Sequence, residues 1–511
     1  MYIFVPAPDQ KNPWHSPSLP HFEPNNSMMF DSVLGRAQMF HQLGEDTLLL
    51  MLNYAPHLRL SLNNYRMTGV KYISFFDWLQ GFEDRLSQPI QLEDLSWPPE
   101  SELIYTPYHL LIKSCGQIYA QVNFSHQGTI IYVDFFSQGN LEQRVYLDDR
   151  GYYSMTEDYR AGEAIRRVYV DHAGKEVLIH HLENDSCELT KPYLPAGFHR
   201  HYAHLKDLLA DYLDYVMAEA FSVEDILIVG SHQAHNDLFI PFSQHRKLVF
   251  AFSSFDSQAI KDWPDIAGNH KILFLVDNQS LKSQLEAEFP QLAQADSTNE
   301  CLVIPAFDSR FELGKSSQIR ENEIIIIVNN MPEQAFQEMI RLLKTWLPDE
   351  KYVLNFISFS TKPQFKQLVN EWQAEYSAEQ ENDDLVFDET EEIIHWHEIR
   401  DDAVFMKLMA TARMMIDVGT VPQAYAQMAA ISVGIPQVNR QSSEFVHHGK
   451  NGYLIDDLGQ LPRAISYFTD DLEKWNQALI YNVRLIETYG SHQLVPALKQ
   501  KFEEYFYDYT H

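Results

Sequence analysis

The sequence predicts an α/β protein with two doubly wound, Rossmann-like halves and an antiparallel β-meander inserted in the first half. Short apolar runs alternate with helical segments near the start of the chain and again after residue 200. That alternation is typical of parallel sheets covered by helices. Between them lie runs rich in Val, Ile, Tyr and Phe, separated by turn residues, as in antiparallel hairpins. A chain of 511 residues is also too long for one ordinary core.

The first parallel-sheet domain is expected to comprise residues 1–85 and 200–312. It begins with an apolar strand at residues 1–6, which Pro6 and Pro8 end. A helical pattern, two further strands and a second helix follow at residues 30–43, 47–52, 71–79 and 202–221. The remaining strands of this half are expected at residues 226–230, 248–252, 271–276 and 301–304.

The inserted domain is expected to span residues 86–199. Its runs are separated by turn chemistry such as Ser-Gln-Gly-Asn and Asp-Asp-Arg-Gly. The predicted strands are residues 103–105, 117–124, 129–136, 142–147, 165–170 and 176–181.

The second parallel-sheet domain is expected at residues 313–511, with the option that the C-terminal helix crosses back to the first. A polar bridge at residues 310–323 precedes its first strand. Strands are predicted at residues 324–328, 352–357, 385–387 and 437–439, and helices at residues 332–347 and 362–372.

Composition narrows the function. The formal net charge is −32, and a field of that sign repels phosphate backbones and anionic lipids, so nucleic-acid and polybasic membrane binding are disfavoured. Three widely spaced cysteines indicate neither a disulfide framework nor a cysteine metal site. No run approaches the ~20 apolar residues of a membrane span, and the N-terminus lacks the basic leader of a signal peptide. The sequence therefore predicts a cytoplasmic protein.

Residues 417–468 carry the most specific pattern. An extended segment, a helix, a Gly-Ile-Pro turn, a short strand and a hairpin signal follow one another. This order is typical of the nucleotide-sugar half of a GT-B glycosyltransferase. A retaining enzyme of that kind grips the donor with two glutamates about eight positions apart, the second about five before the Gly of the turn. Counting back from Gly434, those positions are Ala429 and Val421.

The basic residues of such a site are missing as well. An Arg and a Lys should follow the first strand of the second half and neutralise the departing diphosphate. There the sequence has Asn329, Asn330 and Gln334, and its first basic residue is Arg341. Lys315 precedes the strand. At least three of four charges are absent, so the sequence predicts no catalytic residues and no cofactor, only degenerate donor-site positions.

Other polar clusters have simpler interpretations. The histidines show no complete metal-ligand set, so strand edges, helix starts and turns are expected for them and no metal site is predicted. Gly230-Ser231-His232 follows an expected strand and is interpreted as a tight turn, with anion binding as the alternative. The histidines in question are His199, His201, His204, His395, His397, His447 and His448.

The chain resembles the GT-B-like member of the accessory Sec system, which in Gram-positive bacteria glycosylates and exports serine-rich-repeat adhesins. The resemblance rests on the opening Met-Tyr-Ile-Phe-Val-Pro and on residues 310–327, 427–458 and 465–483. It implies an extended β-sheet insert and a protein inactive as a transferase. It also implies action in a complex with two companion accessory secretory proteins. The adhesin with its glycans and the motor ATPase would be further partners, with peripheral membrane association through partners as an option.

Two alternatives remain open. In the first, the chain is an active glycosyltransferase acting on adhesin Ser/Thr or glycan with a non-standard donor site, built from Gln423, Gln427 or His447. In the second, it is a structural subunit whose meander docks a transferase.

Overall fold

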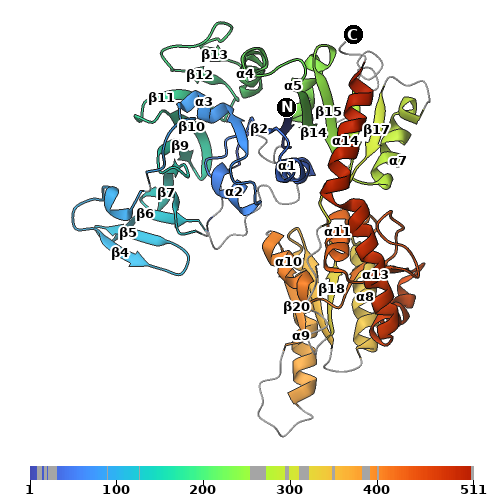
Figure 1. Ribbon diagram of the computed structural model, residues 1–511. Coiled ribbons are helices and arrows are strands. Elements are labelled where there is room, and N and C mark those ends of the chain that lie inside the picture. Colours follow the sequence, from blue (N-terminus) through green and yellow to red (C-terminus); the bar gives the residue numbers. More distant parts are fainter. Residues whose placement is uncertain are drawn as a thin grey trace. The chain divides into compact units, whose positions relative to one another are not determined.

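The protein forms two compact units (Figure 1). The first comprises Met1–Leu275 and Gln291–Glu300, and the second comprises Val276–Pro290 and the chain from Cys301 through its last helix. The computed structural model describes residues 1–7, 14–16, 20, 32–88, 90–125, 127–253, 272–293, 299–309, 322–347, 352–381, 392–399 and 402–507.

The first parallel sheet has the strand order β17-β16-β15-β14-β1-β2-β3. The chain runs outward from β1 to β3, leaves for the insert, and returns at β14 on the other side of β1. This reversal is the order of a doubly wound fold, and β1 pairs in parallel with both β2 and β14. The strands are β1 (Tyr2–Val5), β2 (Thr47–Met51), β3 (Lys71–Ser74), β14 (Ile226–Gly230), β15 (Lys247–Phe252), β16 (Leu273–Val276) and β17 (Glu300–Val303).

Amphipathic helices connect these strands. The buried residues of α4 fall at helical spacing, because Leu205, Leu208, Leu209 and Tyr212 lie on one face. The sequence predicts this helix from residue 202, but His201–Tyr202 pairs with the antiparallel sheet as β13, so α4 begins later. The helices are α1 (Ser32–Gln42), α2 (Leu58–Asn64), α3 (Phe75–Gln80), α4 (Leu205–Glu219), α5 (Gln233–Phe239) and α7 (Gln279–Glu288).

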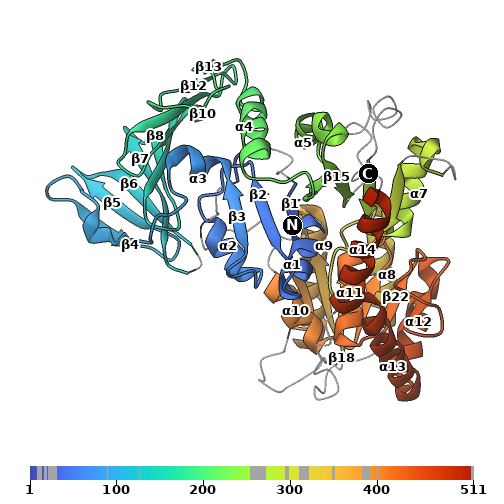
Figure 2. The same ribbon diagram turned by 45° about the horizontal axis from the view of Figure 1, so that its top comes forward.

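The insert is a ten-stranded antiparallel sheet in which neighbours in the chain are neighbours in the sheet (Figure 2). The predicted meander is therefore confirmed, although the sequence pattern does not predict β5, β9, β12 or β13. Strand β9 reads YSMTEDYR, too polar to show an apolar run. The strands are β4 (Glu102–Tyr105), β5 (Leu110–Ser114), β6 (Gln117–Phe124), β7 (Ile130–Ser137), β8 (Asn140–Leu147), β9 (Tyr153–Arg160), β10 (Glu163–Val170), β11 (Glu176–His181), β12 (Cys187–Leu189) and β13 (His201–Tyr202).

An aromatic cluster joins the insert to the parallel half of the first unit. The Tyr54 ring lies 5.4 Å from that of Phe76 and 5.2 Å from that of Tyr169, in edge-on geometry. The Tyr54 hydroxyl donates to Ser154 Oγ at 3.0 Å, so its polar atom is satisfied within the core. Gln80 Nε2 donates to the carbonyl of Ser154 at 2.6 Å. The two sheets of this unit are therefore fixed by packing and by buried hydrogen bonds together.

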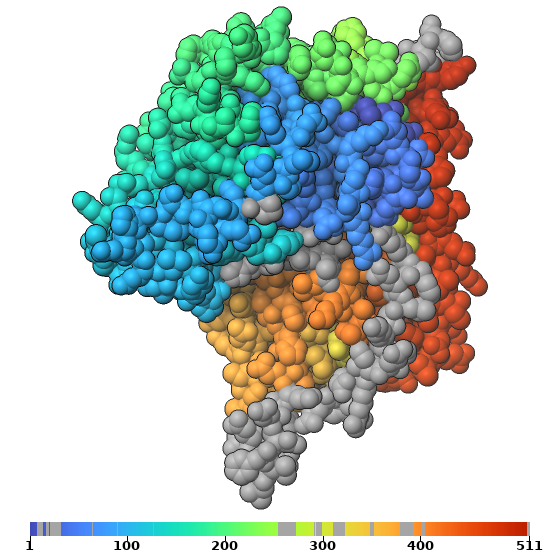
Figure 3. Space-filling model, turned by 60° about the vertical axis from the view of Figure 1, so that its left-hand side comes forward, coloured from blue at the N-terminus to red at the C-terminus, as the bar shows by residue number. Residues whose placement is uncertain are grey.

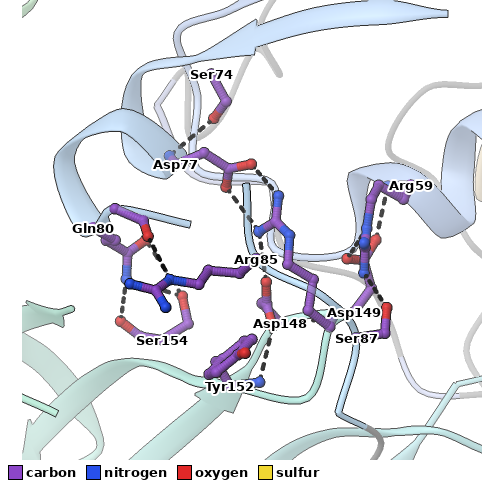
Figure 4. A network of polar contacts seen from close by, with 12 residues as sticks. Arg59, Ser74, Asp77, Gln80, Arg85, Ser87, Asp148, Asp149, Tyr152 and Ser154 are labelled. Carbon is purple, nitrogen blue, oxygen red and sulfur yellow. Dashed lines mark hydrogen bonds and ion pairs between the residues drawn. The ribbon is translucent and has the colours of Figure 1, made fainter. Parts of the chain in front are cut away.

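A polar network beside that cluster also spans the two sheets (Figure 4). Arg150, which is 4% exposed, forms ion pairs with Asp148 at 2.7 Å and with Asp77 of α3. The Tyr72 hydroxyl of β3 accepts from Arg150 Nη2 at 3.0 Å. A buried guanidinium thus has partners on both sides, as a buried charge requires.

The second unit has a parallel sheet of order β20-β19-β18-β21-β22-β23, which again reverses at its first strand. Its strands are β18 (Asn322–Ile327), β19 (Tyr352–Ser358), β20 (Ile394–Glu398), β21 (Met414–Asp417), β22 (Gln437–Asn439) and β23 (Gly452–Leu454). Its helices are α8 (Glu333–Trp346), α9 (Pro363–Glu381), α10 (Asp402–Thr411), α11 (Ala424–Val433), α12 (Leu461–Thr469), α13 (Leu472–Tyr489) and α14 (Ser491–Phe506). The strand predicted at residues 385–387 lies outside the described residues.

The core of the second unit is a continuous apolar layer between this sheet and its helices. Helix α8 contributes Phe336, Met339 and Leu343 at helical spacing. The Phe336 ring stacks on that of Phe365 from α9, with centroids 4.0 Å apart. This layer holds the strand ends in place, including the ends of β18 and β21 that form the candidate site.

Candidate functional site

The candidate site is the C-terminal edge of the second sheet, where β18 and β21 lie side by side. Ligands of open α/β sheets bind at such a point, where the strand order reverses. The loops after the two strands are tied to each other. Thr420 donates its backbone N–H to the carbonyl oxygen of Asn330 at 2.8 Å, and its Oγ1 hydroxyl donates to the same oxygen at 3.0 Å.

Asn329 and Asn330, two of the degenerate donor-site positions, are engaged in holding these loops. Asn329 Oδ1 accepts the backbone N–H of Phe359 at 2.8 Å. Asn330 Nδ2 donates to the carbonyl of Val421 at 2.9 Å. Gln334 is exposed in the first turn of α8. All three side chains are neutral, so none of them supplies the positive charge that a diphosphate requires.

The two positions expected for glutamates carry no ligand-binding group. Val421 is 46% exposed in the loop before α11, and Ala429 is buried within that helix. Gln427 is fully buried, and its Oε1 accepts from Ser443 Oγ at 2.8 Å. Gln423 immediately precedes the helix. The nearby amides therefore either lie within the core or stand at the helix start.

A buried carboxylate, Asp417, lies at the end of β21. It is 3% exposed, and its Oδ2 accepts the backbone N–H of Gln423 at 2.8 Å. Burial raises the pKa of Asp417 to about 6, while the backbone N–H groups of Gln423 and Gly419 oppose that rise. The ionised form places a buried negative charge at the end of β21. No role is predicted for this residue from the sequence, although an Asp that ends a buried strand is a recognisable signal.

Two basic side chains lie on loops at the same edge. Lys362 follows β19, and Arg440 follows β22, which are the strands flanking β18 and β21. The Lys362 ammonium lies 4.6 Å from the centroid of the Phe365 ring, and burial lowers the pKa of Lys362. Arg440 is exposed. Neither residue is predicted from the sequence, because both fall after strands other than the one expected to precede the Arg/Lys pair.

The histidines after β22 belong to a turn. His447 donates its backbone N–H to Asn451 Oδ1 at 2.9 Å. His448 Nδ1 accepts the backbone N–H of Leu454 at 3.0 Å. Burial and then the charge of Lys450 lower the pKa of His447. These contacts favour the turn interpretation.

The other histidine groups lie on strand edges and at a helix start. His204 precedes α4 and lies 3.3 Å from Asp185, which also contacts His180 at 2.8 Å. His397 Nε2 lies 2.8 Å from Asn355 Oδ1 on the neighbouring strand β19. Within the described ranges, no three His, Cys, Asp or Glu side chains gather as a metal site would require.

Gly230 and His232 form a tight turn at the end of β14. A Cβ atom on Gly230 would lie 2.6 Å from the backbone nitrogen of Ala7, so a glycine is needed for the close approach of β14 and β1. His232 Nδ1 accepts the backbone N–H of Ala234 at 3.1 Å. The side chain thus caps the short helix α5, which favours the turn over an anion site.

Two doubly wound sheets, one carrying an antiparallel insert, define a protein with a GT-B-like fold. Within that class, the chain belongs to the family of accessory secretory protein 1 of the accessory Sec system, whose model matches residues 1–505.

Two relatives, each the accessory secretory protein 1 of an accessory Sec system, match along nearly their whole length. That of Staphylococcus aureus (strain NCTC 8325 / PS 47) is 28% identical over 98% of this chain and 99% of its own. That of Streptococcus gordonii is 27% identical over 99% of each chain. The resemblance inferred from the sequence is therefore confirmed.

Solved structures of similar fold fall into two groups. A chain of the Glycosylation Associate Protein (Gap123) complex from Streptococcus agalactiae is 26% identical, with a TM-score of 0.83 over 97% of this chain and 99% of that chain. A chain from the structure of accessory secretory protein 1, 2 and 3 in Streptococcus pneumoniae is 24% identical, with a TM-score of 0.82 over 99% of each. The pneumococcal O-GlcNAc transferase GtfA, in complex with UDP and GlcNAc, is 12% identical, with a TM-score of 0.71 over 93% of this chain and 95% of that chain. The fold is thus shared with glycosyltransferases, and the predicted fold class is confirmed.

None of the described helices combines the length and the apolar character that a membrane span requires.

Proposed function

We propose that this chain is a non-catalytic, glycosyltransferase-like component of the accessory Sec system. It acts in a complex with two companion accessory secretory proteins in the modification and export of serine-rich-repeat adhesins. In this role the chain is cytoplasmic and reaches the inner face of the membrane, and the motor ATPase, through its partners. The adhesin and its glycans are the cargo of the complex.

One observation supports the non-catalytic part of the proposal: the side chains at the expected donor positions are neutral, and the asparagines among them hold loops. Asn329 and Asn330 stand where cations are expected, and both are engaged in loop hydrogen bonds. Val421 and Ala429 stand where glutamates are expected. Loss of one electrostatic donor typically raises a barrier by about 2.7–4 kcal/mol. Without several such groups, the fold lacks the charges that cleavage of a nucleotide sugar requires.

The negative charge of the Asp417 carboxylate supports the same conclusion. A buried carboxylate at the end of β21 repels an anionic leaving group instead of stabilising it. A GT-B frame with this charge pattern is better suited to holding partner proteins or glycan than to cleaving a nucleotide sugar. The complexes of related chains named above support the partner-binding part.

Isothermal titration calorimetry with UDP-GlcNAc tests the non-catalytic proposal. We expect no measurable heat of binding up to millimolar donor. The pneumococcal transferase GtfA, whose crystal holds UDP and GlcNAc, serves as the positive control. A micromolar dissociation constant for any nucleotide sugar contradicts the proposal.

Co-purification with the two companion proteins tests the partner-binding part of the proposal. A stable complex with a transferase pair instead would favour the purely structural role.

The second candidate function is an active glycosyltransferase with a rearranged donor site. Lys362 and Arg440 favour it, because both lie on loops at the donor edge. The experiment is incubation with radiolabelled donors and a serine-rich peptide. Turnover that Lys362→Ala and Arg440→Ala abolish, and that the exposed control Lys344→Ala on α8 preserves, would establish this function. Our proposal expects no turnover from any of these chains.

A further inference from the structure

One edge of the antiparallel sheet is open. Strand β4 is the terminal strand of the ten and pairs only with β5 among the described strands. An edge strand directs alternate backbone N–H and C=O groups away from its sheet, which makes it a template for another strand. Proteins usually protect such edges with Pro, with charged side chains (Lys above all) or with a bulge. Strand β4, Glu-Leu-Ile-Tyr, contains neither Pro nor Lys, its one charged residue is Glu102 at its first position, and its pairing with β5 is regular.

Large apolar side chains are exposed on β4, in the turn that follows it and on β6, two strands further in. Of the 15 exposed large hydrophobic residues in the described chain, five fall between positions 103 and 118. Isolated exposed apolar residues are common in folded proteins, but a cluster indicates a contact surface. Figure 3 shows the blue segment that carries β4 and β5 on the surface of the first unit. The five residues, with their exposed fractions, are Leu103 (42%), Ile104 (41%), Tyr105 (73%), Tyr108 (56%) and Ile118 (46%).

The core of the insert extends to this edge without being closed there. Leu103 pairs with Ile112, and Tyr105 pairs with Leu110, so these side chains share one face of the sheet. Ile112 and Leu110 are buried in the core of the insert. The same apolar layer therefore continues outward into two exposed side chains on β4. A further strand at this edge would complete the layer.

A hollow lies at the end of the same layer. It has a volume of about 430 Å³ and is lined by Tyr105, Pro107, Leu110, Phe124 and Ser125, among others. Side chains of an added strand would alternate between the two faces, so every second one would lie on the Leu103 and Tyr105 side. The hollow can accept one large side chain from such a strand. This combination of backbone pairing and a side-chain pocket is the geometry of strand addition.

The geometry points to an extended segment of one of the two companion accessory secretory proteins, which adds as an eleventh strand along β4. This inference rests on the proposed function for the identity of the partner. The open backbone groups require a polypeptide, because a glycan lacks a regular row of amide donors and acceptors. The segment is expected to carry apolar side chains at alternate positions.

Charge determines the kind of partner. Glu100 and Glu102 are exposed at the start of β4, so the added segment is expected to carry a Lys or Arg opposite them. A second copy of this chain is disfavoured, because two molecules of formal charge −32 repel each other. A different protein that offers an apolar strand with a basic residue at one end would pair with the backbone of β4 and neutralise Glu100 and Glu102.

Hydrogen–deuterium exchange on the full-length chain, alone and with the two companion proteins, tests strand addition directly. Alternate backbone amides of residues 102–105 are expected to exchange at least tenfold more slowly in the complex, because each gains a hydrogen bond. Unchanged exchange at this segment in a complex that does form overturns the edge inference but not the proposed function. Failure of the complex to form contradicts the proposed function itself.

Matched variants test the apolar contact. The Tyr105→Lys variant is expected to weaken the complex at least tenfold in a titration followed by light scattering. The control Tyr193→Lys, a change at an 89%-exposed tyrosine that follows β12, is expected to have no effect. An equal effect of both variants overturns the inference. A dimer of the chain alone that Tyr105→Lys dissociates would assign the edge to a second copy, and protection by a transferase instead of the companions would also overturn it.

Discussion

Arg150, in the turn between β8 and β9, forms an ion pair with Asp77 of α3, 73 positions earlier in the chain. It also holds Asp148, which is 2% exposed, at 2.7 Å. Because removal of one partner from a buried pair leaves an uncompensated charge, Arg150→Ala is expected to lower the free energy of unfolding by about 3–5 kcal/mol. Urea denaturation of the full chain measures this change.

The exposed pair between Arg166 and Asp158 provides the control for Arg150. Arg166 is 46% exposed and lies 2.6 Å from Asp158 on the neighbouring strand. Solvent screens such a pair, so Arg166→Ala is expected to lower the free energy of unfolding by less than about 1 kcal/mol. Equal effects of the two variants would show that Arg150 does not anchor the insert.

Gly151 and Gly162 form a second matched pair in the same sheet. Both have positive φ, 91° and 87°. A Cβ atom on Gly151 would lie 2.0 Å from the carbonyl oxygen of Gln88, whereas a Cβ atom on Gly162 would meet nothing within 4 Å. Gly162→Ala therefore carries only the left-handed backbone strain of roughly 1 kcal/mol. Gly151→Ala is expected to lose at least about 2 kcal/mol more, because backbone must move. Thermal unfolding of both variants gives the difference.

The fold could be predicted from the sequence because apolar runs and turns alone define most strands. Residues 226–230 and 437–439 are predicted at their observed bounds. Strand β9 could not be predicted, because most of its residues are polar and pair with neighbouring strands. Glu157, for example, accepts from Arg167 on β10 at 2.6 Å. Such cross-strand pairs stabilise a strand without leaving an apolar pattern in the sequence.

The candidate site was only partly predictable. Spacing in the sequence singles out positions 329, 330, 421 and 429, whose side chains are neutral. The hydrogen bonds of the two asparagines could not be predicted, because Asn330, for example, finds its partner 91 positions later in the chain. The exposed edge at β4 also required the structure, because a terminal strand and a central strand can have the same sequence pattern.

The asparagines of the donor edge are expected to matter for stability and not for ligand binding. Asn329→Ala removes the hydrogen bond that Asn329 Oδ1 accepts from the backbone N–H of Phe359, so it should lower the free energy of unfolding by about 1 kcal/mol. Gln334→Ala, at an exposed position, is expected to change it by less than about 0.5 kcal/mol. Urea denaturation gives both values. Calorimetry with UDP-GlcNAc should show no binding to wild type or either variant, and donor binding that Asn329→Ala removes would contradict this structural role.

Asp417 is expected to contribute a pH-dependent term to stability whose sign follows from its raised pKa. Burial raises the pKa of Asp417 to about 6 in the folded chain, above its ordinary value of 3.8. A raised carboxyl pKa means that folding favours the protonated form, so this contribution is present below about pH 4 and is lost as pH rises through 6. The loss amounts to roughly 2–3 kcal/mol. The variant Asp417→Asn cannot ionise, so its stability relative to wild type should increase by that amount between pH 4 and pH 7.5.

Urea denaturation at both pH values measures this difference in the free energy of unfolding. The exposed control Asp456→Asn should retain the wild-type dependence on pH. A constant difference between Asp417→Asn and wild type at the two pH values would mean that the carboxylate is solvated at the donor edge and free to meet a ligand there.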